Sequence, residues 1–372
     1  MIQLSPEESL LILTCRPSLA QDDHARLEKI IAKPLDWSFV LWRAETYQTL
    51  PLLGHHLQRL GSATAIPAFV HDYIKNWSLV SRARTIEQFR QLGQIINLLE
   101  QIGVNHFLLK GIALAPLVYP DPALRPMQDL DIMIPPRSAW KVQQAIYSLG
   151  YRHGVFDPQT GRFTHRFQRI TRHSLLRTHA LPSVTKSVRV PLPCSPELIP
   201  SSWRKRQLKS FVNSDGTITI PVFVDFHVNL SAGMELDDVW RGTAPKAVLG
   251  QKVAMQSSTA LLWFSAARLY CEAFEHGTLK LQMFGDIDGI LTNLTNEIDW
   301  AELLVIAQKY RLTPALYYVL SQARQLYGSP VPPNVLELLA PNQRELPAAN
   351  DWGDPIPKLL SRAVVHRFEF AS

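Results

Sequence analysis

The chain has 372 residues, 46% of them hydrophobic, which gives room for two or three domains with a hydrophobic core. It has no apolar run of 18 residues or more, so no membrane span is expected, and its three cysteines, far apart and without a Cys-x-x-Cys motif, argue against a disulfide framework or a zinc site. Its net charge is +6, and Glu7 and Glu8 precede the first apolar run, where a signal peptide would be basic, so we expect a reduced, cytoplasmic protein.

The N-terminal region, residues 1–103, is predicted to be helical. Asp22-Asp23 lie at the start of one candidate helix, and residues 35–50 carry the apolar face of a second. From Pro67 to Gly103, apolar residues recur mostly every three or four positions, which predicts one helix of about 36 residues with proline in its first turn. We expect this region to be a packing scaffold.

Two carboxylates follow on one predicted strand. A short apolar strand over residues 105–109 ends at Lys110-Gly111, and after a helix over about 111–119 the segment 129–134 alternates acidic and apolar residues. Alternation places Asp129 and Asp131 on one face, with Cβ atoms roughly 6.6 Å apart. At a separation of ~5 Å and an effective dielectric of about 20, two carboxylates repel by roughly 3 kcal/mol. The pair therefore favours a bound divalent cation, for which Mg²⁺ is suited, although a solvated edge strand is the alternative.

One segment carries the basic character of the chain. Residues 152–209, the basic segment, contain twelve lysines and arginines against two acids, a surplus larger than that of the whole protein. Aromatic and apolar residues interleave with the arginines, and this pattern is typical of a basic wall facing a polyanion or nucleotide; an ordinary solvated sheet face is the alternative. His165, His173 and His179 lie here without the spacing of a metal cluster.

A second acidic strand follows the basic segment. Asp215-Gly216 predicts a hairpin turn into a strand over 217–227, on which Asp225 and His227 share one face. Helices then resume from about 247. They include residues 281–294, where Asp286 and Asp288 lie two positions apart and therefore project in nearly opposite directions.

Several of these motifs together resemble a known family. Leu109-Lys110-Gly111, Tyr119-Pro-Asp121, and Arg125 followed by Asp129-Leu-Asp131 resemble the uncharacterised bacterial branch of the nucleotidyltransferase superfamily, which has the polymerase-beta type of catalytic fold. The resemblance is tight over about 105–150 and continues through the strand that carries Asp225. Lys110-Gly111 replaces the Gly-Gly or Gly-Ser turn of the general superfamily, and the gap to the carboxylates is longer than in the polymerases.

The resemblance implies an α+β protein in four parts. We expect an N-terminal helical region (1–103), a small mixed-sheet nucleotidyltransferase core (104–235) that includes the basic segment (152–209), a C-terminal helical region (236–330) and a Pro-rich tail (331–372). The implied activity is metal-dependent transfer of an NMP from an NTP to a hydroxyl acceptor on a small molecule or protein, with release of pyrophosphate.

The resemblance also implies roles for particular residues. Asp129, Asp131 and Asp225 are expected to bind Mg²⁺, with Mn²⁺ as the alternative ion, and Asp225 is also expected to act as general base. Nucleotide binding is assigned to four residues that carry positive charge or backbone N–H groups toward the phosphates. They are Lys110, Gly111, Arg125 and His227.

Two other functions remain open at this level. The basic segment is compatible with an RNA-directed nucleotidyltransferase, and a non-catalytic nucleotide-binding protein would keep the same fold. For Lys110 and Arg125, plain surface salt bridges are the alternative. No Gly-x-x-x-x-Gly-Lys-Ser/Thr, His-Glu-x-x-His or Gly-x-Ser-x-Gly motif occurs in the sequence, so those chemistries are not indicated.

Overall fold

A computed structural model describes residues 4–60, 66–166, 179–199, 210–231, 234–248, 250–274 and 281–340. The chain forms two compact units. Unit 1 comprises residues 1–75, 118–125 and 258–372, and unit 2 comprises residues 76–117 and 126–257. Unit 2 contains the sheet, so the predicted mixed α+β class is confirmed, while the predicted four-part division stays a prediction.

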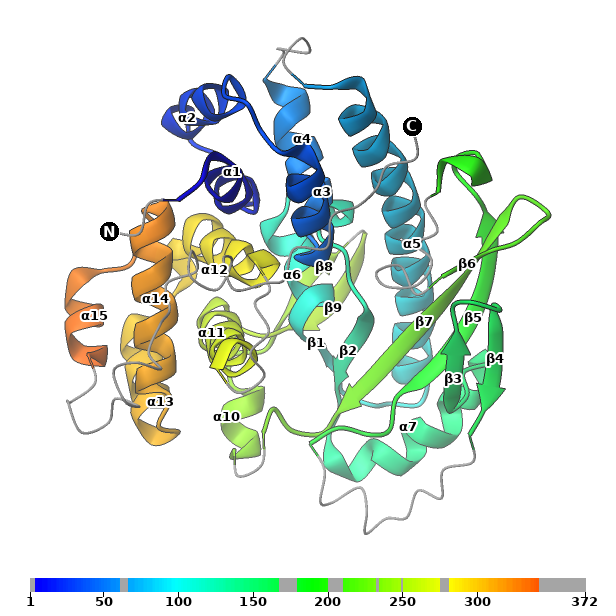
Figure 1. The fold of residues 1–372 in the computed structure, drawn as a ribbon. Coiled ribbons are helices and arrows are strands. Elements are labelled where there is room, and N and C mark those ends of the chain that lie inside the picture. The colour runs from blue at the N-terminus through cyan, green and yellow to red at the C-terminus, as the bar shows by residue number, and fades with distance from the viewer. Residues whose placement is uncertain are drawn as a thin grey trace. The chain divides into compact units, whose positions relative to one another are not determined.

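Unit 2 is built on a mixed seven-stranded sheet with the order β5-β7-β2-β1-β9-β8, and β6 also pairs with β7 (Figure 1). The β2–β7 and β1–β9 pairs are parallel and the others are antiparallel. The strands are β1 (Phe107–Leu108), β2 (Asp129–Met133), β5 (Val184–Pro191), β6 (Phe211–Val212), β7 (Thr217–His227), β8 (Ala244–Val248) and β9 (Gln251–Met255). A separate two-stranded sheet is formed by β3 (Gly154–Asp157) and β4 (Arg162–His165).

The predicted strands and turn of this core are confirmed. The Asp-x-Asp segment forms β2, and the strand predicted over 217–227 is β7. Gly216 has a φ of +75°, a backbone conformation that glycine adopts without strain, and the chain reverses there between β6 and β7. The local sequence signals therefore gave the correct element types across the acidic strands.

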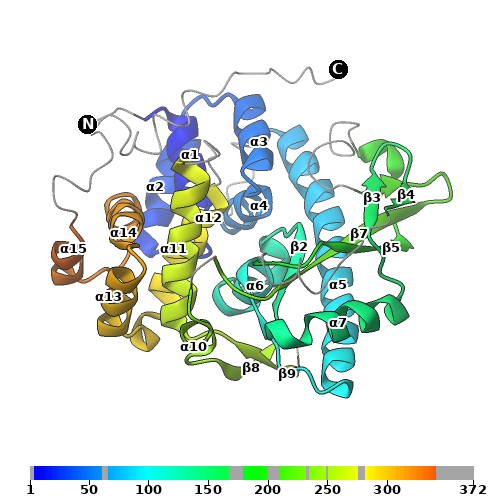
Figure 2. The same cartoon turned by 90° about the horizontal axis from the view of Figure 1, so that it is seen from below.

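The helices of unit 2 include the long one predicted from periodicity. That helix is α5 (Ala68–Gln101), with 34 residues, and its part from Asn76 onward belongs to unit 2. The others are α6 (Lys110–Val118), α7 (Ala139–Ala145), which continues as a 3-10 turn over Ile146–Leu149, and α10 (Leu236–Trp240). Figure 2 shows the strands of this unit in a second view with α5, α6 and α7 around them.

Helix α5 lies against one face of the sheet. The opposite face carries Asp131 and Asp225 and is called the acidic face. Lys186 on β5 is paired with Val222 on β7, and its Nζ donates to Gln91 Oε1 of α5 at 3.1 Å. Val222 and Val224 therefore face α5. Asp225 alternates with them on β7 and projects to the opposite face. The carboxylates thus lie on the face of the sheet that α5 does not cover.

Unit 1 is helical in its described parts, as predicted for both flanking regions. Its N-terminal helices are α1 (Pro6–Thr14), α2 (Gln21–Ile31), α3 (Trp37–Thr46) and α4 (Leu50–Arg59). Its C-terminal helices are α11 (Ser258–Phe274), α12 (Leu281–Asn293), α13 (Trp300–Lys309), α14 (Thr313–Tyr327) and α15 (Pro333–Leu339). Val335 and Leu339 of α15 are buried, so helical packing continues past residue 330, and residues 341–372 of the predicted tail lie outside the described part.

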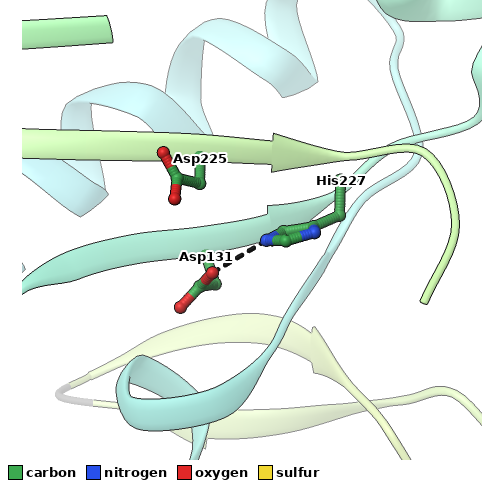
Figure 3. Close-up of side chains that lie close together, drawn as sticks. All are labelled: Asp131, Asp225 and His227. Atoms are coloured by element: carbon green, nitrogen blue, oxygen red, sulfur yellow. Dashed lines mark hydrogen bonds and ion pairs between the residues drawn. The ribbon is translucent and has the colours of Figure 1, made fainter. Parts of the chain in front are cut away.

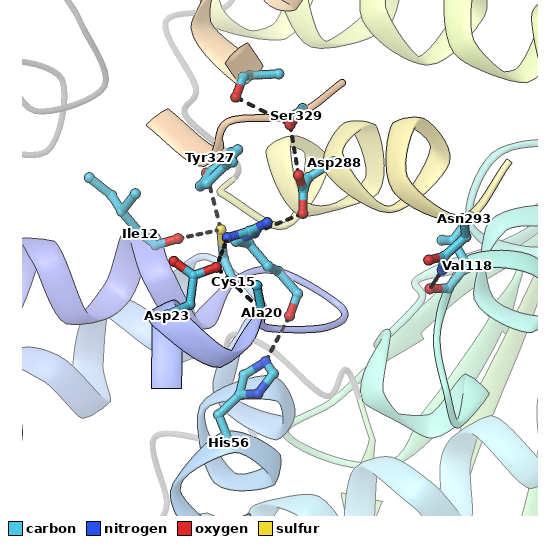
Figure 4. A network of polar contacts seen from close by, with 12 residues as sticks. Ile12, Cys15, Ala20, Asp23, His56, Val118, Asp288, Asn293, Tyr327 and Ser329 are labelled. Carbon is cyan, nitrogen blue, oxygen red and sulfur yellow. Dashed lines mark hydrogen bonds and ion pairs between the residues drawn. The ribbon is translucent and has the colours of Figure 1, made fainter. Parts of the chain in front are cut away.

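Buried polar contacts link the N-terminal and C-terminal helical parts of unit 1. Asp288 accepts hydrogen bonds from Arg16 Nε at 2.8 Å and from Ser329 Oγ at 2.7 Å, and the Cys15 thiol lies 3.2 Å from the Tyr327 hydroxyl (Figure 4). Asp286, two positions earlier on α12, has other partners, as predicted for a helix. Among the described residues, no helix combines the length and the apolar character needed to cross a membrane.

Candidate functional site

The register of β2 against β7 determines which side chains meet on the acidic face. These strands are parallel, and Asp131 lies directly opposite Asp225, while Met133 lies opposite His227. Neighbouring strands are about 4.8 Å apart, so side chains on one face at the same level come close together. Asp131, Asp225 and His227 therefore converge although 96 residues separate the first from the last (Figure 3).

These three side chains offer a set of donors that fits a divalent cation. One ligand atom from each lies within 4.8 Å of the other two. Asp131 is 1% exposed, His227 is buried and Asp225 is half-buried, so the set is accessible mainly from the side of Asp225. Two carboxylate oxygens and one imidazole nitrogen are ligands that divalent metals accept in proteins, and open positions would remain for substrate or water.

Lys110 brings a positive charge to the same place. Its ammonium contacts Asp131 Oδ1 and lies 3.2 Å from His227 Nε2, and His227 Nε2 is itself 2.8 Å from that carboxylate oxygen. Lys110 is the first residue of α6 and has a φ of +53°. A non-glycine residue pays about 1 kcal/mol or more for a left-handed backbone. The chain accepts this strain at the point where the superfamily resemblance places a glycine.

The charges of the site keep Asp131 ionised. Burial by itself would raise the pKa of this carboxyl, but the hydrogen bond with His227 and the positive charge of Lys110 outweigh burial and hold the pKa below its usual value. The ring of His179 stacks on that of His227, with centroids 6.3 Å apart. Partial burial, together with the charges of His227 and Lys110, lowers the pKa of His179.

Helix α5 fixes the segment that enters β2. Arg84 Nη2 donates to the carbonyl of Gln128 at 3.2 Å, and Gln88 Nε2 donates to the carbonyl of Met127 at 3.2 Å. Burial lowers the pKa of Arg84 to about 10, and the charge of Asp129 opposes that shift. Neither of these α5 residues was predicted from the sequence. Their only signal was polar character within an otherwise apolar helical periodicity.

The structure brings some of the predicted site residues together and not others. Lys110, Asp131, Asp225 and His227 form one group, and Gly111 follows Lys110 in the first turn of α6. Asp129, at the start of β2, is half-buried and is not one of the three converging donors among the described residues. The functional roles of all these residues stay predictions.

Arg125 belongs to a different polar group, in unit 1. Its guanidinium forms a bidentate pair with Asp286, with Nε at 2.7 Å and Nη2 at 2.5 Å from the two carboxylate oxygens. Tyr119 donates to the same carboxylate at 2.6 Å, and Arg125 is 8% exposed. Of the three histidines considered above as a metal cluster, His165 lies on β4, His179 lies beside His227, and His173 lies outside the described residues.

Comparison with known proteins adds one finding. A family model described as an uncharacterised nucleotidyltransferase matches residues 33–328, which is most of the chain and includes every residue of the acidic face. No curated protein and no solved structure matches the chain.

Proposed function

The chain belongs to this family of uncharacterised nucleotidyltransferases, and from that membership and the acidic face we propose that it transfers a nucleoside monophosphate from an NTP to a hydroxyl acceptor. The bond between the α- and β-phosphates breaks, a bond from the α-phosphorus to the acceptor oxygen forms, and pyrophosphate leaves with its electron pair. The acceptor hydroxyl gives up its proton. The observation that carries the proposal is the register that pairs Asp131 with Asp225 on neighbouring parallel strands.

The donor set supports a divalent cofactor, which we take to be Mg²⁺ or Mn²⁺. Asp131 and Asp225 would hold it, with His227 as a third donor and with Asp129 two residues away on the same strand face. When bound, such an ion neutralises triphosphate charge and favours the ionised form of an acceptor hydroxyl. Carboxylates alone would repel the triphosphate, so we expect NTP binding to require the metal.

The start of α6 supports phosphate binding. The Lys110 ammonium contacts Asp131 on the acidic face, and the backbone N–H groups that begin at Gly111 point out of the N-terminal end of the helix. Both features attract an anion to the edge of the metal site. For Arg125, by contrast, the buried pair with Asp286 supports a structural role within unit 1.

Asp225 is the best candidate for the general base. Asp131 is buried and engaged by Lys110 and His227, so it is held ionised as a ligand. Asp225 lies beside it and is half-buried, which leaves it accessible to an acceptor. A carboxylate there can accept the proton of the acceptor hydroxyl while the ion holds the phosphate.

Labelled nucleotides test this proposal. The protein is incubated with Mg²⁺ or Mn²⁺, a cell extract, and ATP, GTP, CTP or UTP labelled at the α-phosphate or, separately, at the γ-phosphate. We expect label from the α-phosphate in an acceptor and pyrophosphate in solution, and loss of both with Asp225→Asn. Asp157→Asn, a half-buried carboxylate at the end of β3, serves as the matched control. Transfer of γ-label, or NTP binding that is unchanged by a chelator, would contradict the proposal.

For the acceptor, we propose a small molecule or protein, with RNA as the alternative. Two cations of the basic segment are already engaged: Lys186 with Gln91, and Arg189 with Asp215. Residues 167–178 and 200–209 of this segment lie outside the described part of the chain. If RNA is the acceptor, the affinity for RNA should fall steeply as the salt concentration rises. A protein that binds no RNA at ~50 mM salt would exclude the RNA-directed alternative.

A further inference from the structure

The ammonium of Lys110 is placed where a metal ion would be bound. It contacts Asp131 Oδ1 and lies 3.2 Å from His227 Nε2, so it engages two of the three converging donors. We infer that Lys110 and a divalent cation are alternative occupants of these two atoms. Lys110 holds the donor set together before the ion arrives, and it moves away when the ion binds. This inference rests on the proposed function, whose metal site it describes in more detail.

Burial explains why the resting site needs an internal cation. Asp131 is 1% exposed, and an ionised carboxylate removed from water requires a compensating charge. The Lys110 side chain is 17% exposed and provides that charge through its contact with Asp131. The strained backbone of Lys110 supports this role. If the lysine side chain had no function here, glycine at this position would relieve the strain and make the protein more stable.

The same contacts exclude a metal ion while Lys110 remains. An imidazole nitrogen carries either one proton or one lone pair, so His227 Nε2 can donate to Asp131, accept from Lys110 or bind an ion, but only one of these at a time. Two cations sharing Asp131 Oδ1 would also repel each other at close range. Binding of the ion therefore requires Lys110 to break its contact with Asp131.

The displaced ammonium gains a new partner only when nucleotide is present. Lys110 begins α6, the helix whose N-terminal N–H groups we assign to phosphate binding. Its ammonium can exchange the Asp131 carboxylate for a triphosphate oxygen, which keeps it paired. A divalent ion alone should consequently bind weakly, and ion and NTP should each increase the affinity for the other.

Metal affinity in the absence of nucleotide tests the inference directly. Binding of Mn²⁺ to the full-length protein is measured by electron paramagnetic resonance and calorimetry, for wild type, Lys110→Gln and Lys186→Gln. Lys186 is a matched control, because it is a partly buried lysine of the same sheet that faces α5. A hydrogen bond between charged groups is worth about a tenfold change in affinity or more, so we expect Lys110→Gln to bind Mn²⁺ about tenfold more tightly than the other two proteins.

A second measurement does not depend on a variant that folds. Lysine acetylation of the wild-type protein is followed by mass spectrometry, with Lys186 as internal reference. We expect Mn²⁺ alone to increase the labelling of Lys110, and Mn²⁺ with ATP to decrease it again. A labelling rate of Lys110 that Mn²⁺ leaves unchanged or lowers would overturn the inference.

The outcomes separate this inference from the proposed function. If Mn²⁺ binds wild type and Lys110→Gln equally, or binds the variant more weakly, Lys110 does not compete with the ion, and the inference fails while the metal site stands. If none of the three proteins binds Mn²⁺ with or without NTP, the proposed function fails, and the inference fails with it.

Discussion

Replacing either carboxylate of the converging pair by asparagine should abolish metal binding, but only one replacement should destabilise the fold. Asp131→Asn removes the negative charge of a carboxylate that contacts the Lys110 ammonium and accepts a hydrogen bond from His227. Asp225→Asn removes a half-buried carboxylate that lies directly opposite Asp131 in the strand pair. The two substitutions are identical in chemistry and occupy opposed positions in one strand pair, so each is the control for the other.

The magnitudes follow from burial. Breaking a fully buried ion pair costs about 3–5 kcal/mol, and because the Lys110 side chain is 17% exposed we expect Asp131→Asn to cost about 2–3 kcal/mol. Asp225→Asn relieves repulsion between two carboxylates that lie within 4.8 Å, an effect that solvent at the half-buried Asp225 weakens. The stability of this variant should equal that of wild type or exceed it slightly.

Urea unfolding in the presence of a chelator measures both effects. The change in midpoint, followed by circular dichroism and at unchanged slope, gives the change in the free energy of unfolding for each variant. Mn²⁺ binding is measured on chelator-free samples of the same proteins. Equal destabilisation by the two substitutions, or a loss confined to Asp225→Asn, would refute the assignment of Asp131 as the compensated, buried member of the pair.

Three further predictions concern unit 1. Asp286→Asn should lower the free energy of unfolding, measured in urea, by about 3–5 kcal/mol, because it leaves the buried Arg125 guanidinium uncompensated. Loss of transfer activity without loss of stability would instead indicate a role in the reaction. Gly285→Ala should cost at least about 2 kcal/mol, because its Cβ would lie 2.0 Å from the carbonyl oxygen of Cys15; a wild-type midpoint would contradict this. Burial lowers the pKa of His56 from 6.5 to about 4, so the folded state resists protonation, and stability should fall by about 3 kcal/mol as pH decreases from 6.5 to 4. Unfolding at a series of pH values tests this, and His56→Gln should lack the slope.

The pairing of Arg125 with Asp286 illustrates a contact that no local pattern reveals. These residues are 161 positions apart, and Arg125, which precedes the Asp-x-Asp strand by four residues, was expected to bind nucleotide from the family resemblance. Proximity in sequence was the only available guide to its partner. The fold instead provides a carboxylate from α12, and Asp286 neutralises the guanidinium within unit 1.

His227 and Lys110 show the same limit at the acidic face. Alternation along β7 placed His227 on the face of Asp225, but it did not show that Nε2 would lie 2.8 Å from Asp131 Oδ1. Lys110 was recognised as a cation after a short strand. Its left-handed backbone and its contact with Asp131 depend on how α6 leaves β1.

Local patterns in the sequence were enough to predict the elements of this protein and the faces of its strands, because hydrophobic periodicity, turn residues and strand alternation act over a few neighbouring residues. The 34-residue helix α5, the turn at Gly216 and the shared face of Asp129 and Asp131 all follow from such local rules. Which charged side chains meet, by contrast, depends on how these elements pack together. The parallel register of β2 and β7 sets Asp131 against Asp225 and brings His227 to both, and strand register depends on contacts between segments almost a hundred residues apart.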